Sequence, residues 1–122
     1  MRAVLAALLV AGCATGGSTG DSLADAIGTR IAQPARDCIS PSLATDTRII
    51  DSQTIVYRRG GTIYVNRLQS ACPGLRPQAT LVTEVLSGQL CRNDMVRAAY
   101  PNEAVPGPRC RLGEFTPYAL PR

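Results

Sequence analysis

The residues of this chain best suited to chemistry are its five cysteines, Cys13, Cys38, Cys72, Cys91 and Cys110. A thiol can act as a nucleophile, a metal ligand or a disulfide partner. The sequence contains no His, so neither a Ser-His-Asp triad nor a Cys-His pair can form. Metal sites are usually built from close pairs such as C-x₂-C, whereas the last four cysteines are separated by 34, 19 and 19 residues. This spacing favours two disulfides in an exported domain.

Four cysteines allow three disulfide connectivities, and their spacing alone does not choose among them. We expect Cys72–Cys91 as a local bridge and Cys38–Cys110 as a bridge that ties the first part of the domain to the last. In the chain-entropy account each bridge stabilises the fold by roughly 3 to 4.5 kcal/mol. Such bridges matter here because the chain has one Phe, no Trp and four Tyr, which makes its core poor in aromatic side chains.

The fifth cysteine, Cys13, follows a short apolar run from Ala3 to Ala11, and a single positive charge, Arg2, precedes that run. The run has about half of the ~20 residues that a membrane-spanning helix needs. A positive start, a short apolar core and small residues before a cleavage site indicate a secretory signal. The stretch Leu9-Val10-Ala11-Gly12-Cys13 resembles the lipobox of bacterial lipoproteins. The alternative is an ordinary secretory signal with an incidental cysteine.

The lipobox resemblance implies that residues 1–12 are removed and that Cys13 is acylated on its thiol and on its new amine. Two or more acyl chains hold a protein firmly to a bilayer, so the lipid bilayer is the implied partner. Residue 14 is Ala rather than Asp, which by the sorting rule of the family sends the protein to the outer membrane, facing the periplasm. Envelope proteins and cell-wall polysaccharide are the other candidate partners.

The charge balance argues against nucleic acid as a partner. Removal of Arg2 with the signal leaves 12 basic residues, all of them Arg, against nine acidic ones. This excess is mild, whereas nucleic-acid binding requires clustered positive charge. The arginines remain available for contact with anionic lipid or polysaccharide. We expect no metal and no cofactor.

Paired carboxylates are a second route to chemistry, because an acid and a base can together hydrolyse a glycosidic bond. The carboxylates that could form such a pair are Asp51, Glu84, Asp94, Glu103 and Glu114. Asp51 and Asp94 lie at predicted turns, where Asp is common for structural reasons, so their presence needs no catalytic role. We therefore do not expect an enzyme.

Three residues are candidate binding residues. Arg58 and Arg59 lie at the tip of a predicted hairpin, where they could contact an anionic partner, with a solvated turn as the alternative. Asp94 follows Cys91 closely, and its alternative role is to bond nearby backbone amides in an Asx turn.

Short strands must position these residues. β-rich runs at Thr54–Tyr57 and Thr62–Val65 flank Arg58-Arg59-Gly60-Gly61 and predict a tight hairpin, with Ile55 and Tyr57 on one face and Ile63 and Val65 on one face of the return strand. Further strands are predicted at 47–50, 80–86, 90–91, 95–99 and 110–115, with a helix as the alternative for 80–86. After the last of these strands the chain ends in a tail that contains Pro117 and Pro121. Five or six short strands indicate a mainly β fold, a small antiparallel sheet or barrel.

The segment before this domain differs in composition and in its pattern of apolar residues. Residues 14–20 predict a flexible tether. Leu23, Ile27 and Ile31 recur every four residues and predict a short helix, capped by Asp21 or Ser22 and ended by Pro34, with a disordered tail as the alternative. We therefore divide the chain into a signal peptide (1–12), a lipidated cysteine with tether and helix (13–35), and a disulfide-stapled β domain (36–122).

Residues 36–117 carry a second pattern: Cys38-Ile39, Asn66-Arg67-Leu68, Cys72 to Leu75, Leu90 to Asp94 and Cys110 to Phe115. This layout resembles small uncharacterised lipoprotein domains of Gram-negative bacteria. The resemblance implies a disulfide-stapled domain and assigns no activity to any residue. We expect a membrane-anchored envelope lipoprotein that acts as a non-enzymatic binding or structural module. The alternative is an inhibitor or small enzyme acting on cell-wall polysaccharide.

Overall fold

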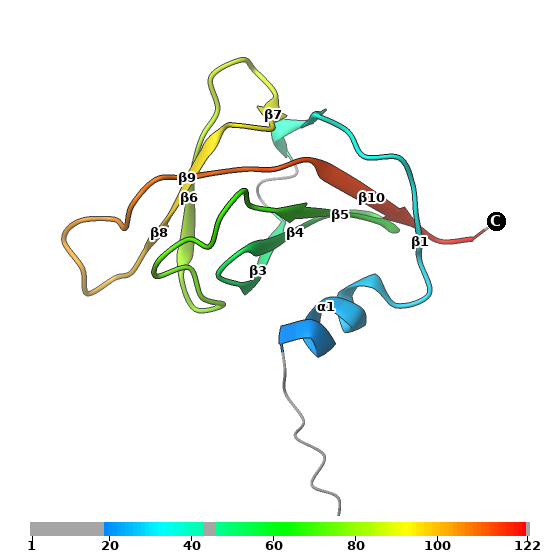
Figure 1. The fold of residues 1–122 in the computed structure, drawn as a ribbon, viewed down its shortest axis with the longest axis horizontal. Coiled ribbons are helices and arrows are strands. Elements are labelled where there is room, and N and C mark those ends of the chain that lie inside the picture. Colours follow the sequence, from blue (N-terminus) through cyan, green and yellow to red (C-terminus); the bar gives the residue numbers. More distant parts are fainter. Residues whose placement is uncertain (1–18, 43–45, 122) are drawn as a thin grey trace, which may run out of the picture.

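The computed structural model describes residues 19–42 and 46–121 (Figure 1). The predicted signal, Cys13 and most of the predicted tether lie outside the described residues. Within the described ranges the chain forms one helix and ten strands, which confirms the mainly β fold. The sequence predicts five or six strands. The observed number is larger because several strands are only two residues long. The elements are α1 (Thr19–Ile27), β1 (Ile31–Ala32), β2 (Cys38–Ile39), β3 (Thr47–Asp51), β4 (Thr54–Arg59), β5 (Thr62–Arg67), β6 (Thr80–Glu84), β7 (Leu90–Cys91), β8 (Met95–Ala99), β9 (Cys110–Arg111) and β10 (Phe115–Ala119).

The strands form three antiparallel sheets. The central sheet has five strands in the order β1-β10-β5-β4-β3. A two-stranded sheet pairs β2 with β7, and a three-stranded sheet has the order β6-β8-β9. The segment 80–84 is a strand, as predicted. No helix in the described part of the chain is long and apolar enough to cross a membrane.

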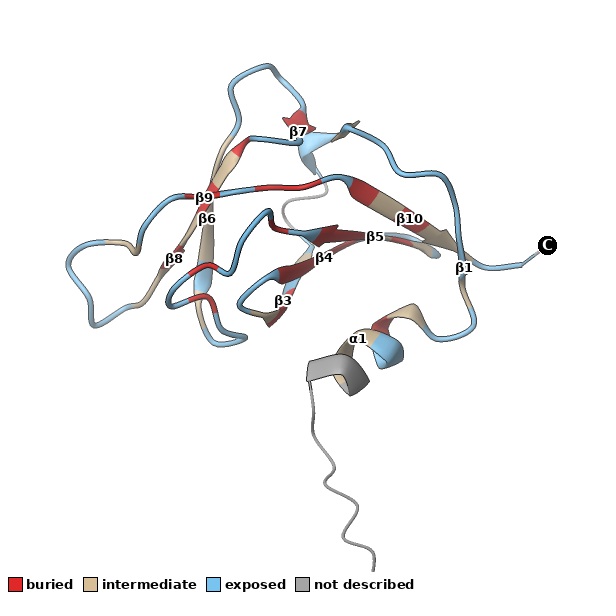
Figure 2. Ribbon diagram, viewed as in Figure 1, coloured by how far each residue is buried: buried red, intermediate tan, exposed pale blue. Residues whose placement is uncertain are grey.

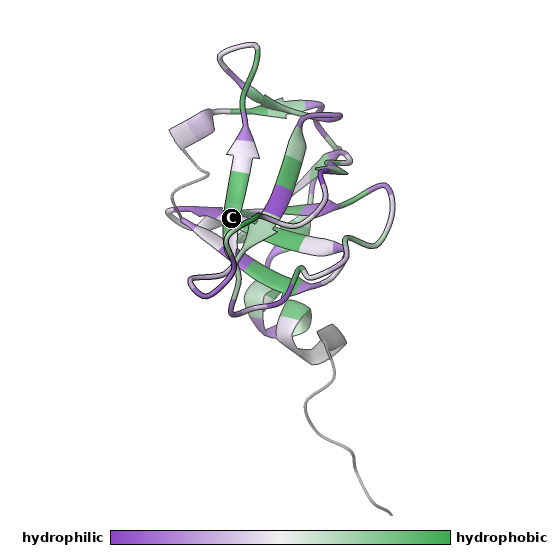
Figure 3. Cartoon of the chain, turned by 90° about the vertical axis from the view of Figure 1, so that its left-hand side faces the viewer, coloured by the Kyte–Doolittle hydropathy of each residue, from purple (hydrophilic) through white to green (hydrophobic). Residues whose placement is uncertain are grey.

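The hairpin of β4 and β5 is the centre of the fold and confirms the prediction. Tyr57 lies opposite Tyr64, and Val56 lies opposite Val65. At the tip, Gly60 has a φ of 56°, a left-handed conformation that glycine adopts at no steric cost. Because side chains alternate between the two faces of a strand, the hairpin presents one apolar set to each side of the central sheet. Figure 3 shows hydrophobic and hydrophilic residues alternating along the strands.

Two hydrophobic clusters cover the two faces of the central sheet. On one face, Ile55, Tyr57 and Phe115 pack against residues from the other two sheets, which include Leu90 and Val96. Buried residues accordingly occur in β4, β5 and β10 (Figure 2). The Tyr57 ring is 5.7 Å from that of Phe115, in a tilted arrangement. Burial of these side chains is the main source of the stability of the fold.

The second cluster joins α1 to the opposite face, which we call the α1 face. Ala26 of the helix is buried with Val56, Ile63 and Val65, and Leu23 packs beside them. This confirms the predicted helix but not its bounds: it begins at Thr19, so Asp21 and Ser22 lie within it and do not precede it, and it ends at Ile27, before Ile31. Gly28 adopts a φ of 58° and ends the helix. Ile31 therefore lies in β1, where it pairs with Ala119.

The C-terminal region departs from prediction. Residues 110–115 form two strands instead of one, because the chain crosses at 112–114 from the three-stranded sheet to the central sheet. At this crossing Gly113 passes so close to β5 that a Cβ atom would collide with the Arg67 carbonyl oxygen. The chain continues as strand beyond the predicted end at Phe115, and Pro117 lies inside β10 opposite Tyr64.

All four cysteines of the domain form disulfides, as predicted, but the predicted pairing is wrong. The bridges are Cys38–Cys91 and Cys72–Cys110. The physical reason is strand pairing: Cys38 of β2 lies directly opposite Cys91 of β7, with their Cα atoms 4.0 Å apart. Sequence spacing carries no information about this contact between distant strands.

Candidate binding surface

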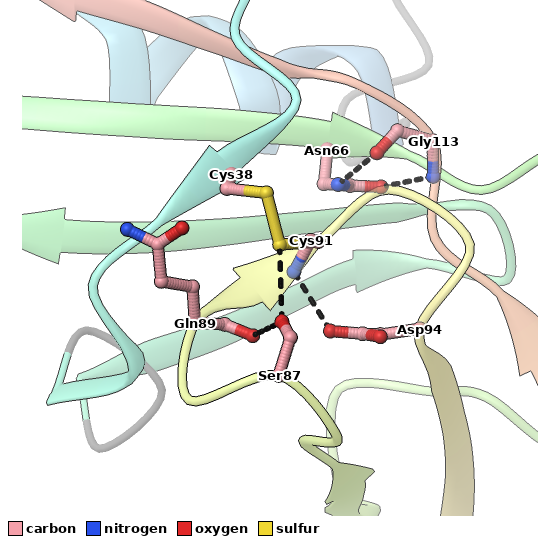
Figure 4. Close-up of a disulfide and its surroundings, with 7 residues drawn as sticks. All are labelled: Cys38, Asn66, Ser87, Gln89, Cys91, Asp94 and Gly113. Atoms are coloured by element: carbon pink, nitrogen blue, oxygen red, sulfur yellow. Dashed lines mark hydrogen bonds between the residues drawn. A yellow bond between two sulfur atoms is a disulfide. The ribbon is translucent and has the colours of Figure 1, made fainter.

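The predicted binding residue Asp94 has a structural role. Its carboxylate oxygen Oδ2 accepts a hydrogen bond from the backbone N–H of Cys91 at 2.8 Å (Figure 4). The N–H of Asp94 in turn donates to the Cys91 carbonyl at 3.0 Å. Only 9% of Asp94 is exposed. The tight turn 91–94 places Asn93 at a φ of 75°, a conformation that Asn tolerates better than most residues. This arrangement matches the turn alternative considered for Asp94.

Beside this turn, a buried side-chain amide joins the central sheet to the crossing segment at 112–114. The Asn66 amide nitrogen donates to the Gly113 carbonyl at 2.8 Å, and its oxygen accepts from the Gly113 N–H at 2.9 Å (Figure 4). Asn66 is fully buried. Its two hydrogen bonds satisfy the backbone of the crossing segment, which has no strand partner at that point. Asn66 therefore supports the fold.

Arg58 and Arg59, the other predicted binding residues, are exposed at the end of β4, but they are not brought together with Asp94. They lie at the Gly60 end of the hairpin, whereas Asn66, which bonds to the crossing segment near Asp94, lies at the other end. Because side chains alternate, the two arginines also occupy opposite faces of the central sheet. Arg58 shares the α1 face with Val56, and Arg59 shares the other face with Tyr57.

The candidate catalytic carboxylates are also dispersed. Glu84 forms ion pairs with Arg97 and Arg109, at 3.7 and 3.0 Å. Glu114 pairs with Arg92 at 3.1 Å. The remaining carboxylates lie in separate turns and loops: Asp51 accepts from the Gln53 N–H at 2.8 Å, Asp94 closes its own turn, and Glu103 lies exposed between β8 and β9.

Five surface hollows among the described residues are each lined by at most one carboxylate. A two-carboxylate hydrolase requires its acid and its base on either side of one bound sugar. None of these five hollows has that arrangement.

Two of the hollows flank α1, and both contain arginines. The first, of about 140 Å³, lies beside Ala26 and is lined by Arg48 and Arg58 together with Asp46. The second, of about 420 Å³, lies beside Leu23 and is lined by Arg67 and Arg92. Val65 and Tyr118 form apolar parts of this second hollow. A guanidinium group next to an apolar surface suits an amphipathic ligand with an anionic head.

Strand register explains why these arginines share a face. Arg48 lies opposite Val56 and Arg67 lies opposite Thr54, so both follow the same alternation as Arg58. None of the three forms an ion pair with a described carboxylate. Sequence reasoning missed Arg48 and Arg67. The available signal was alternation: Arg48 precedes the inward-facing Ile49 of β3, just as Arg58 follows Tyr57 of β4.

Arg30 holds α1 against the hairpin. Its Nη1 donates to the carbonyl oxygens of Ala26 and Ile27, at 3.2 and 3.3 Å, at the end of the helix. Its Nε donates to the Gly61 carbonyl at the hairpin tip, at 2.7 Å. The position of α1 on the sheet is therefore set by hydrogen bonds at its C-terminal end as well as by apolar packing.

Three buried polar atoms have no hydrogen-bond partner in the described structure: Oγ1 of Thr54, the hydroxyl of Tyr57 and Nε of Arg97. The Tyr57 hydroxyl lies inside the main cluster without a hydrogen bond. Burial disfavours the charged phenolate and raises the pKa of Tyr57 well above its ordinary value of 10. Surrounded by the main cluster, this hydroxyl faces no ligand site.

Comparison of the chain with protein family models, with curated proteins and with solved structures found no match. Any functional proposal therefore rests on the residues of this chain.

Proposed function

We propose that the protein is a membrane-anchored lipoprotein of the cell envelope, acylated at Cys13 after removal of residues 1–12, and that its folded domain is a non-enzymatic binding or structural module. The observation that carries this proposal is the pair of disulfides in the domain. Such bonds persist in oxidising compartments outside the cytoplasm. The lipobox at residues 9–13 then supplies the means of attachment, and Ala14 favours the outer membrane.

The non-enzymatic role is supported by what the domain offers for contact. Four of its five candidate carboxylates are used in turns and ion pairs, and the chain has no His to act as a general base. The α1 face instead presents Arg48, Arg58 and Arg67 without carboxylate partners among the described residues. These groups favour recognition of anionic groups through charge-assisted hydrogen bonds.

The test is a fractionation of cells that express the full chain with Cys13→Ser. We expect the wild-type protein to sediment with membranes, and its mature N-terminal peptide to carry the mass of acyl chains on Cys13. The variant should lose the acyl mass. As a matched control, Ala14→Asp keeps the acylated cysteine and should move the protein from the outer to the inner membrane. Wild-type protein with normal processing and no acyl mass at Cys13 would contradict the proposal.

A further inference from the structure

We propose that the α1 face of the central sheet lies against the anionic lipid surface in which the protein is anchored. The surface consists of α1 and the arginines around it, Arg48, Arg58, Arg67 and Arg92. This inference rests on the proposed function, because the acylated Cys13 is what holds the domain at the bilayer.

The first argument is the reach of the chain. Five residues, 14–18, separate Cys13 from Thr19, the first residue of α1. A chain of this length spans at most about 20 Å even when fully extended. The helix is therefore the element held nearest to the acyl chains. In Figure 1 it lies below the central sheet, whereas β2 and β7 lie above that sheet and β6, β8 and β9 lie to its left.

The second argument is charge. The basic groups of this face lie on both flanks of the helix, in the hollows beside Ala26 and Leu23. Four described carboxylates lie near these arginines: Asp25 is exposed on α1, Asp46 shares the first hollow, Asp51 lines a further hollow with Arg67, and Glu114 is paired with Arg92. Arg48, Arg58 and Arg67 form no ion pair with any of the described carboxylates, so their charges stay available for an anionic group. The guanidinium groups thus offer phosphate headgroups bidentate partners on either side of the helix.

The third argument is the neighbouring apolar surface. Leu23 and Tyr118 line the larger hollow beside Arg67 and are only partly buried. A headgroup held by Arg67 would place the upper part of its acyl chain near these side chains. Polysaccharide, by contrast, has no acyl chain to place against them.

A consequence for the rest of the domain follows from this orientation. The loop between β6 and β7 extends on the side of the fold away from α1, at the top of Figure 1. Leu86 in this loop is 83% exposed. Contact of the α1 face with lipid therefore leaves this loop directed away from the bilayer, available to the surroundings of the protein.

The test uses the full acylated protein in vesicles and measures backbone hydrogen exchange. One set of vesicles mixes phosphatidylethanolamine with phosphatidylglycerol, and the other contains phosphatidylcholine alone. We expect slower exchange at residues 22–31 and 46–58 in the anionic vesicles only, with no change at 85–89. Raising the salt concentration to about 1 M shortens the Debye length to about 3 Å. The difference in exchange between the two kinds of vesicle should then disappear.

Two double variants supply the matched comparison. Arg48→Glu with Arg58→Glu reverses two charges on the α1 face, and Arg36→Glu with Arg59→Glu reverses two exposed charges away from it. Each arginine near an anionic bilayer strengthens contact about fivefold, so the first variant should weaken docking at least about 25-fold and lose the protection. The second variant should retain it.

The outcomes separate the inference from the function on which it rests. Acylated wild-type protein that exchanges equally in both lipids overturns the inference alone, as does equal loss of protection in both double variants. Protection of the same residues by soluble cell-wall fragments, and not by anionic vesicles, assigns the face to polysaccharide and also overturns it. Absence of an acyl group at Cys13 overturns both proposals.

Discussion

The buried amide of Asn66 provides the sharpest test of how this fold is held together. Its two hydrogen bonds, at 2.8 and 2.9 Å, satisfy the N–H and carbonyl of Gly113, where the chain passes between two sheets. In Asn66→Ala both bonds disappear, and the Gly113 backbone groups are left in a buried position. The loss should therefore exceed that of an ordinary surface hydrogen bond.

The magnitude follows from the burial of both partners. Each hydrogen bond contributes about 1 kcal/mol net, and a buried group left without a partner costs a further ~1–3 kcal/mol. Some of this cost is offset if water enters the space that the amide vacates. We expect the free energy of unfolding to fall by about 3 kcal/mol. For a domain of about 100 residues this lowers Tm by more than about 10 °C.

Urea and thermal unfolding of the oxidised protein, followed by circular dichroism, measure this loss. Gln69→Ala is the matched control, because the Gln69 amide also bonds to the crossing segment, at the Leu112 carbonyl (3.0 Å), but from an exposed position. The control should change the free energy of unfolding by less than about 1 kcal/mol. If Asn66→Ala is no more destabilising than Gln69→Ala, the amide does not hold the crossing segment.

Three further predictions concern other parts of the core. Gly113→Ala should destabilise the domain by at least as much as Asn66→Ala, because its Cβ atom would displace the Arg67 carbonyl, and a wild-type urea midpoint would contradict this. Above pH 10 stability should fall, by up to about 1.4 kcal/mol per pH unit, because Tyr57 ionises in the unfolded chain while its raised pKa keeps it neutral in the fold. Urea midpoints measured against pH should show a shallower alkaline slope in Tyr57→Phe, and an unchanged slope would refute this origin. Peptide mapping should recover Cys38 linked to Cys91, and a Cys72–Cys91 peptide would contradict this pairing. Replacing both cysteines by Ala should lower the free energy of unfolding by about 4 kcal/mol, because the bridge closes a 53-residue separation.

Local features of the fold were predictable from the sequence because local residues determine them. The alternation around Ile55 and Tyr57 and the two glycines at 60 and 61 specify the central hairpin without reference to other segments. The helix near Leu23 was predictable in the same way, from a spacing that matches its periodicity. Gly28 was visible in the sequence as well, but its left-handed conformation, which ends the helix before Ile31, was not.

Features that depend on contacts between distant segments were not predictable. Nothing near Cys38 in the sequence indicates that it faces Cys91, because that contact arises from the pairing of β2 with β7. Likewise, Pro117 indicates a loop by its chemistry, yet the alignment of β10 against β5 places it in a strand. The α1 face was missed for the same reason, since Arg48 and Arg67 come together only when β3, β4 and β5 are assembled.

The order of the cysteines along the chain has a consequence for biogenesis. The two bridges interleave along the chain: Cys38 pairs with Cys91, and Cys72, which lies between them, pairs with Cys110. A chain exported amino terminus first, as proposed here, exposes Cys38 and Cys72 to an oxidising compartment before either native partner arrives. Premature joining of these two thiols creates a non-native bridge, which only exchange through a mixed disulfide can remove. Maturation of this protein should thus depend on disulfide isomerisation and not on oxidation alone.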